Sequence, residues 1–394
     1  MFPLSIWSNF PEEEFICAIA NCNNLSASGS DKLLWGHLKC IIKDKTCLKN
    51  IVIIANACFE LGYWPNHFKK STMIFIPKPN KSSYDSPKSF RPIVLLNTMG
   101  KLIEKVIRDK LQFQVVSNNF IHQSQLGGLK FKSTIDIGIA LTYFIHIGWI
   151  KNMLTSSLAF DIAQFFPSLN HRLLALILEK AGFKSRVVNF FSNYLVNRKT
   201  KYFWNNFSSS LFDVNVGVGQ GLALSPILSA LYLSPFLHIL EKHSKNLDLK
   251  FSILSFVDDG LLIIQSKSFQ FSNTQLFSSY NVTSKLLSKF CLLVEHLKTE
   301  IFHFSKSQGT FNPPPLDLSP ISGPYLIPKD TWRYLGFSFD RKLCFRQQID
   351  FYTNKAISTV KCIKILGNST RDLNPQQKHL LYRSCTLLIA LYSF

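Results

Sequence analysis

Apolar positions along the chain follow two kinds of spacing, and each predicts a different element. Spacing of three and four residues predicts helices, and short apolar runs predict strands. The predicted helices begin at Pro11, run from Leu33 to Phe59, and recur at Gly100–Val115, Thr134–Ile150, Leu173–Leu178, Leu224–Leu240 and Val282–Leu293. The strand-type runs are Thr72–Pro79, Ser156–Ile162, Ser252–Ile264, Ile301–Phe304 and Trp332–Phe339. This mixture predicts an α/β (α+β) fold.

The run Ser252–Ile264 is interrupted by Phe256–Gly260, which contains two neighbouring acids. Two apolar runs around an Asp-Gly pair predict a β-hairpin with a tight turn. Because Asp258 and Asp259 are adjacent like charges beside apolar residues, they require water, a proton or a cation. A solvated turn explains the pair. The alternative is a divalent-metal site, since carboxylate oxygens suit magnesium.

A third acid lies at the end of another predicted strand. Asp161 ends the run Ser156–Ile162, and the chain then turns at Pro167 towards a helix. Asp161 could be a helix cap or a turn residue. Alternatively, it would meet the hairpin pair across adjacent strands of one sheet, as a third carboxylate.

The charge balance is strongly basic. The chain has 44 Lys and Arg against 24 Asp and Glu, a net charge of +20. A surplus of this size favours a polyanionic partner, first of all nucleic acid, over an indifferent basic surface. Between Gly62 and Lys132 twelve basic residues stand against three acids, and between Arg341 and Arg383 nine stand against two.

Several classes of protein are disfavoured. The nine cysteines include no Cys-x-x-Cys pair, which predicts reduced thiols in an intracellular protein without a disulfide-linked partner. A zinc site from the five early cysteines remains open. The start of the chain lacks a signal-peptide layout. The best apolar run, Ile135–Ile150, contains Asp136 and His146 and is too short to span a membrane, so no membrane partner is expected.

The elements follow in the order strand with Asp161, glycine loop (Gly217–Gly221) and helix, Asp-Asp hairpin, helix, lysine and strand. This order resembles the palm of polymerases. Four phrases make the similarity more specific; they are Phe75–Asn80, Ser89–Ile93, Leu95–Lys105 and Phe256–Asp259. On these phrases, the chain from about Ser26 to Phe394 resembles the reverse transcriptase of non-LTR (LINE-type) retrotransposons.

The resemblance implies a polymerase right hand with an antiparallel-sheet palm, fingers and a helical thumb. The expected division is a helical extension at 1–60, fingers and palm at 61–340, and a truncated thumb at 341–394. The implied function is RNA-directed DNA synthesis, with an RNA template, a DNA primer and dNTPs as partners and Mg²⁺ or Mn²⁺ as cofactor. A nuclear location follows by analogy with the family.

The resemblance also assigns catalytic roles. Asp161, Asp258 and Asp259 match the metal-binding acids, and the carbonyl of Ile162 would lie beside them on the metal. Asp258 is expected to share the metal ions with Asp161, and Asp259 to have a more peripheral role. Lys298 matches a lysine near the pyrophosphate and is a candidate proton donor.

The remaining candidate residues would handle nucleotide, template and primer. Phe166 matches an aromatic gate against a ribose 2′-hydroxyl. The residues matched to the nucleotide and template are Lys78, Arg91, Gln220 and Gly221. The residues matched to the hairpin that holds the primer end are Tyr334, Leu335 and Gly336.

Some positions depart from the family pattern. Leu222 stands where a small serine is usual, Phe165 where alanine is usual, and Leu297 where a polar residue is usual. Members of the family usually carry an endonuclease that this chain does not supply, so we expect a fragment of a longer element or the product of a decayed copy. Two alternatives therefore stay open: an inactive remnant that at most binds nucleic acid, and a maturase-like RNA-binding protein.

Overall fold

The computed structural model describes residues 9–79, 81–246, 251–307, 312–367 and 373–392. The chain divides into two compact units, each assembled from separate stretches. Unit 1 comprises Met1–Lys132, Ile162–His243 and Val282–Val294, and unit 2 comprises Ser133–Asp161, Ser244–Asn281 and Glu295–Phe394. The three-part division into extension, fingers with palm, and thumb stays a prediction. The start of the chain, Asn80 and Phe394, which are named above, lie outside the described residues.

Unit 1 is rich in helices. They are α1 (Glu12–Ala20), α2 (Trp35–Ile41), α3 (Lys45–Glu60), α4 (Asn66–Lys69), α5 (Thr98–Ser117), α7 (Phe165–Ser168), α8 (His171–Lys180) and α9 (Ser185–Leu195), and α10 (Ser225–Asn246) begins here. The helical region expected from Leu33 to Phe59 is divided, because the carboxylate of Asp44 accepts from the amide of Cys47 and starts α3 as a new helix. Helix α9 was not predicted.

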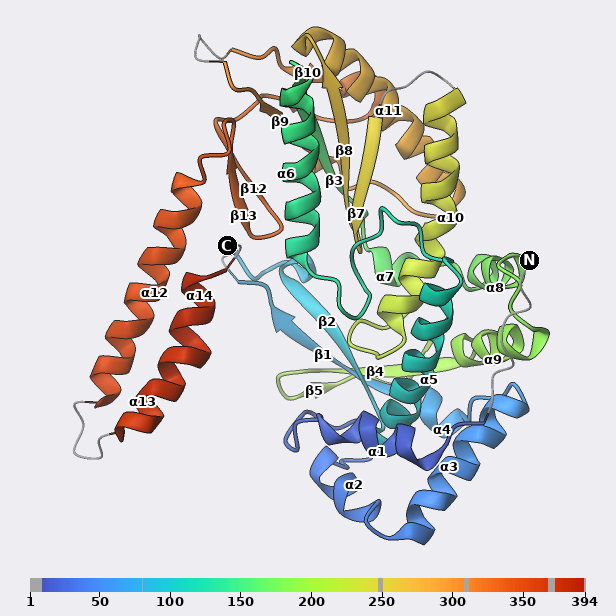
Figure 1. The fold of residues 1–394 in the computed structure, drawn as a ribbon. Helices are drawn as coiled ribbons and strands as arrows, with labels where there is room; N and C mark the ends of the chain where they lie inside the picture. Colours follow the sequence, from blue (N-terminus) through green and yellow to red (C-terminus); the bar gives the residue numbers. More distant parts are fainter. Residues whose placement is uncertain (1–8, 80, 247–250, 308–311, 368–372, 393–394) are drawn as a thin grey trace. The chain divides into compact units, whose positions relative to one another are not determined.

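The sheet of unit 1 contains β1 (Lys70–Pro77), β2 (Phe90–Leu96), β4 (Arg198–Trp204), β5 (Phe207–Ser208) and β6 (Phe212–Val214). β2 pairs antiparallel with β1, and β4 pairs parallel with the other side of β1 (Figure 1). Strand β2 begins at Phe90, in a segment for which no strand was predicted. Pro92 favoured a loop in the sequence, but the β2 edge of this sheet tolerates a residue without an N–H donor.

Unit 2 is built on a four-stranded antiparallel sheet. Its strands are β3 (Leu154–Asp161), β7 (Phe251–Phe256), β8 (Asp259–Ser266) and β9 (Glu300–Phe304), in the order β7-β8-β3-β9. The six interior residues of β3 are all buried, as expected of a central strand. Helix α6 (Thr134–Ile150) has the predicted bounds, and Asp136 within its apolar run accepts from the amide of Ser133 as part of its N-terminal cap.

Helix α11 (Phe269–Lys289) begins thirteen residues before the predicted start at Val282. The part of α11 before Val282 is rich in Ser and aromatic residues and contains Asn and Thr, and residues of these types weaken a helix prediction. Leu276 and Tyr280 lie in this part and are fully buried. Burial of these two side chains therefore stabilises a helical segment that the local helix propensity does not predict.

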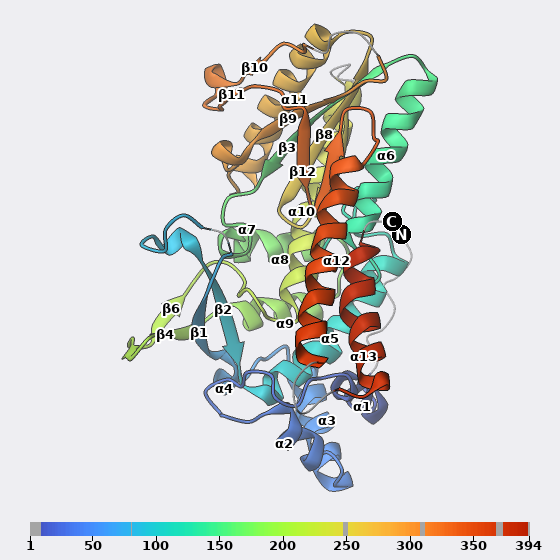
Figure 2. The same cartoon turned by 90° about the vertical axis from the view of Figure 1, so that its left-hand side faces the viewer.

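The last part of unit 2 is a hairpin followed by helices. The hairpin is β12 (Thr331–Tyr334) and β13 (Phe337–Asp340), as predicted. Helix α12 (Arg346–Gly367) then lies beside α13 (Pro375–Leu381), the π-helical segment Tyr382–Leu387 and α14 (Leu388–Ala390) (Figures 1 and 2). In the part of the chain that the structure describes, no helix combines the length and the apolar character needed to cross a membrane.

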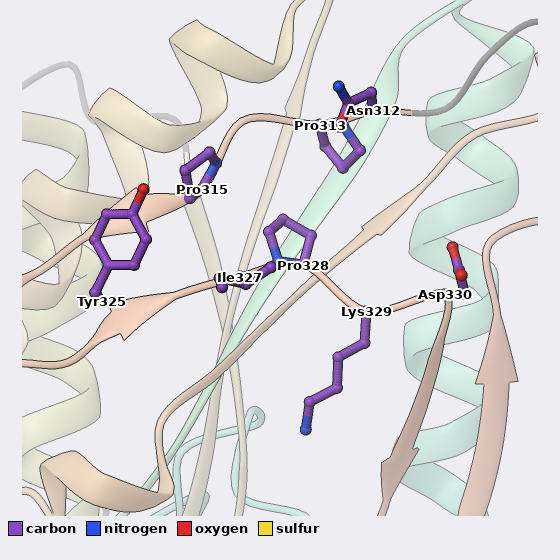
Figure 3. Close-up of a pocket in the computed structure, with 8 residues that line it drawn as sticks. All are labelled: Asn312, Pro313, Pro315, Tyr325, Ile327, Pro328, Lys329 and Asp330. Carbon is purple, nitrogen blue, oxygen red and sulfur yellow. The ribbon is translucent and has the colours of Figure 1, made fainter.

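The proline-containing segment before this hairpin contains short elements of its own. They are β10 (Leu316–Asp317), the turn Ser319–Ile321 and β11 (Tyr325–Leu326). A pocket of about 360 Å³ lies beside them, and Figure 3 shows its lining. The lining residues are Asn312, Pro313, Pro315, Tyr325, Ile327, Pro328, Lys329 and Asp330, none of them a candidate catalytic residue.

A buried histidine lies in the sheet of unit 2. His303 on β9 is 1% exposed, and its Nδ1 lies 2.7 Å from the hydroxyl of Ser156 on β3. Its Nε2 has no hydrogen-bond partner among the described residues. Burial lowers the pKa of His303 to about 4, so the ring is neutral at physiological pH.

This histidine predicts a pH-dependent stability. The unfolded chain takes up a proton near pH 6.5, whereas folded His303 takes one up only near pH 4. Stability from this group is therefore present above about pH 6.5 and lost as the pH falls towards 4, by up to about 3 kcal/mol. The free energy of unfolding, measured by urea denaturation at pH values between these two, should change less with pH in His303→Gln than in wild type. The exposed His379→Gln variant is the control. An equal pH dependence in His303→Gln and wild type would contradict the prediction.

Candidate active site

The register of the central strands brings two acids together in unit 2. Asp161, the last residue of β3, is paired with Asp259, the first residue of β8. Asp259 is also paired with Phe256, the last residue of β7. The backbone carbonyl of Asp161 accepts from the amide of Glu295 at 2.8 Å, which holds the end of β3 in place. The backbone therefore places Asp161 opposite one of the hairpin acids on the adjacent strand, where the sequence led us to expect them.

The hairpin turn lies earlier than the Asp-Gly pair suggested. Its two turn residues are Val257 and Asp258, because Phe256 already pairs with Asp259. Val257 has φ +60°, a left-handed conformation that is rare for a β-branched residue. Gly260 lies within β8, where a Cβ would come 2.2 Å from Cζ of Phe160. The glycine is thus required by close packing against a ring rather than by the turn.

The acids of this hairpin are short of positive charge. Burial, followed by the charges of Asp258 and Asp161, raises the pKa of Asp259 to about 7. Burial and the charge of Asp161 also raise the pKa of Asp258. Both shifts have the cause that the sequence suggested, which is close like charges away from water.

Lys298 supplies the positive charge that these acids have in the structure. Its ammonium group forms an ion pair with Oδ2 of Asp161. Burial lowers the pKa of Lys298, but the hydrogen bond and charge of Asp161 outweigh it, so the pKa lies above its usual value. The hydroxyl of Tyr280 holds the turn that carries this lysine, at 2.7 Å from Nδ1 of His296 and 3.2 Å from Oγ1 of Thr299.

The oxygen donors of these acids suit a hard divalent cation. Carboxylate oxygens are the ligands that magnesium prefers, and the pKa values of Asp258 and Asp259 are raised first by burial and then by neighbouring carboxylates. Among the described residues, no group of three or more His, Cys, Asp or Glu side chains is arranged to hold a metal. Ile162 is 3% exposed and forms a bridge with Val294 in unit 1.

The residues matched to the primer lie in the same unit as the acids. Leu335 (φ +48°) and Gly336 (φ +90°) form the two-residue turn between β12 and β13. Positive φ at both positions is typical of a tight hairpin turn. Tyr334 precedes this turn and stacks on Trp332 with ring centroids 4.7 Å apart. Burial, and then the charge of Asp259, raises the pKa of Tyr334 well above its usual value.

The residues matched to the nucleotide lie in unit 1, where backbone hydrogen bonds connect them. The amide of Val218 donates to the carbonyl of Phe166, and the amide of Val94 on β2 donates to the carbonyl of Gln220, each at 2.8 Å. Gly221 has φ +95°. The glycine loop is thus held between the segment of Phe166 and strand β2, which also carries Arg91.

Lys78 and Arg91 differ in what their side chains do. The ammonium group of Lys78 donates to the carbonyl of Lys88 at 2.8 Å, and so ties the ends of the loop between β1 and β2. Arg91 is exposed and paired in register with Ile76. Arg91 is therefore the better placed of the two to bind a phosphate group.

Two of the residues that depart from the family pattern are buried in the core of unit 1. Leu222 is 5% exposed and packs with Val94 and Leu96, and Phe165 is 2% exposed. Their bulk fills the interior and does not project from the loop. Leu297, in contrast, is 89% exposed. The sequence did not identify Tyr280 as a residue that supports the site. A polar group on the buried side of a helix was its only indication.

The chain is similar to known polymerases along most of its length. Residues 76–339 match the family model of the reverse transcriptase (RNA-dependent DNA polymerase). The probable RNA-directed DNA polymerase from transposon BS of Drosophila melanogaster is 23% identical and covers 96% of this chain. The RNA-directed DNA polymerase from the mobile element jockey of the same species is 24% identical over 77% of the chain. The chain spans 41% and 32% of the lengths of these two relatives.

A solved structure has the same fold. The telomerase of Candida tropicalis, in complex with the TWJ fragment of telomeric RNA, gives a TM-score of 0.50 at 15% identity. The likeness covers 82% of this chain and 53% of that chain. It confirms the expected mixed α/β polymerase fold.

The packing of Gly260 generates a prediction for the hairpin. Gly260→Ala should lower the free energy of unfolding by about 1–3 kcal/mol, because the new methyl group overlaps the ring of Phe160. Adding Phe160→Leu should recover part of this loss. Gly36→Ala on α2 is the control, since a Cβ there meets its nearest atom at 3.4 Å. Urea denaturation measures all three, and equal stability of the Gly260 and Gly36 variants would refute the packing explanation.

Proposed function

Because this chain belongs to the reverse transcriptase (RNA-dependent DNA polymerase) family, we propose that it copies an RNA template into DNA. Nucleotides would pass from dNTPs to the 3′-hydroxyl of a DNA primer. The observation that supports this most directly is the register that pairs Asp161 with Asp259 and leaves Asp258 in the adjoining turn.

Asp161, Asp258 and Asp259, with the carbonyl of Ile162, would hold divalent cations, Mg²⁺ or Mn²⁺. When bound, such ions activate the primer hydroxyl and stabilise the leaving pyrophosphate. A cation favours the ionised form of Asp258 and Asp259, and so reverses the rise in their pKa values. Lys298, protonated beside Asp161, would be a proton donor to the leaving pyrophosphate.

The incoming nucleotide would be bound by residues of unit 1. Gln220 and Gly221 would lie under its base, and Phe166 would close against the ribose at the position of a 2′-hydroxyl. Arg91 offers a bidentate fork for phosphate, and Lys78 a point charge nearby. The hydrogen bonds of the glycine loop with Phe166 and Val94 support a common role for these residues.

The primer end would be held by Tyr334, Leu335 and Gly336 of the β12–β13 turn. The net charge of +20 would hold template and primer through their phosphates, so binding should weaken as salt rises. We propose a nuclear location on the family resemblance alone.

Substitution of the acids tests the proposal. Asp258→Asn and Asp161→Asn should each lower primer extension on an RNA template by at least about 100-fold, because charge stabilisation at the reacting phosphate is lost. Extension is measured with Mg²⁺ and with Mn²⁺, and RNA binding is measured by gel shift. Asp350→Asn, an exposed acid on α12, should retain extension.

Extension by Asp258→Asn at the wild-type rate would refute the assignment of the site. A wild-type chain that binds RNA but extends no primer with either metal would instead identify an inactive copy.

A further inference from the structure

Unit 1 contains a fully buried carboxylate that the proposed reaction does not use. Glu104 lies on α5 and is 0% exposed. A buried carboxylate is costly unless hydrogen bonds and an opposite charge compensate it. Its partners therefore indicate why the position tolerates a charge.

Both oxygens of Glu104 accept hydrogen bonds from distant parts of unit 1. The hydroxyl of Tyr194 on α9 donates to Oε1 at 2.5 Å, and the backbone amide of Ala223 donates to Oε2 at 3.2 Å. Arg198 on β4 lies over the ring of Tyr194, with its guanidinium carbon 4.7 Å from the ring centroid. Burial raises the pKa of Glu104, and the charge of Arg198 followed by the two hydrogen bonds opposes that rise.

The hydrogen bond from Ala223 to Glu104 lies directly after the glycine loop in the sequence. Ala223 follows Gly221 by two residues, and Leu222 between them is buried against Val94 and Leu96. The carbonyl of Gln220 is held by the amide of Val94, and the carbonyl of Gly219 by the hydroxyl of Ser225. With Gly221 in a left-handed conformation, the segment after Gln220 depends on Leu222 and on the Glu104 bond for its path.

We propose that Glu104 is a positioning residue for nucleotide binding: its carboxylate holds the Ala223 amide and thereby keeps Gln220 and Gly221 in their binding conformation. This inference rests on the proposed function for its consequence in the reaction. The holding of the loop is a property of the folded chain and can be measured without activity.

Three variants of the full chain separate this role from ordinary stabilisation. Glu104→Leu removes both hydrogen bonds. Tyr194→Phe removes one bond from the same network and keeps the bond to Ala223. Glu104→Gln keeps an amide oxygen that can accept from Ala223. If Glu104→Leu leaves Arg198 buried and unpaired and does not fold, Glu104→Leu with Arg198→Met removes both charges.

Kinetics give the first measurement. Glu104→Leu should raise KM for dNTP about tenfold, the factor for loss of one hydrogen bond to a charged group, with kcat changed less than about threefold. Tyr194→Phe should leave KM for dNTP near its wild-type value. In Glu104→Gln, KM for dNTP should lie much closer to the wild-type value than in Glu104→Leu. An unchanged KM in Glu104→Leu, with a loss of stability equal to that of Tyr194→Phe, would overturn the proposal.

Amide hydrogen exchange gives the second measurement. Peptides that cover residues 217–224 should exchange about tenfold faster in Glu104→Leu than in wild type or Tyr194→Phe. Unchanged exchange there overturns the proposal whether or not the wild-type chain extends a primer. Faster exchange in a chain without polymerase activity would uphold the holding of the loop while the proposed function fails.

Discussion

The antiparallel pairing of β3 with β8 determines where negative charge collects in unit 2. It places Asp161 opposite Asp259 and leaves Asp258 in the turn, on strands that are buried along their length. Burial and the charge of Asp161 raise the cost of ionising Asp258 and Asp259. Lys298 compensates Asp161, yet burial and the neighbouring charges still raise the pKa of Asp259 to about 7.

The two units treat buried charge differently. In unit 1, Glu104 has permanent donors on both oxygens and Arg198 nearby, although burial still raises its pKa above the usual value. In unit 2, the charge of Asp161 raises the pKa of both Asp258 and Asp259, and the charge of Lys298 opposes these shifts. Permanent partners suit a residue that holds a backbone segment. A shortage of them, with raised pKa values, is typical of functional sites.

The sequence was informative where one strand and its polar interruption carried the signal. Asp161 at the end of a buried strand, and Asp258 with Asp259 between two apolar runs, could be paired before the structure was known. The turn was misplaced because Asp-Gly is a strong turn signal, whereas the packing of Gly260 on Phe160 has no local signature. The bond between Glu104 and Ala223 joins residues 119 positions apart, and periodicity does not reveal such a pairing.

The division of the chain into interleaved stretches also bears on how it folds. The backbone passes from one unit to the other after residues 132, 161, 243, 281 and 294. Neither unit is a continuous piece, so neither can complete its core during synthesis before the region around Val294 has been made. Apolar strands such as β3 therefore stay unpaired during synthesis until β8 and β9, their later partners, have been made. Non-local connectivity of this kind favours slow folding and leaves apolar strands open to aggregation until their partners have been made.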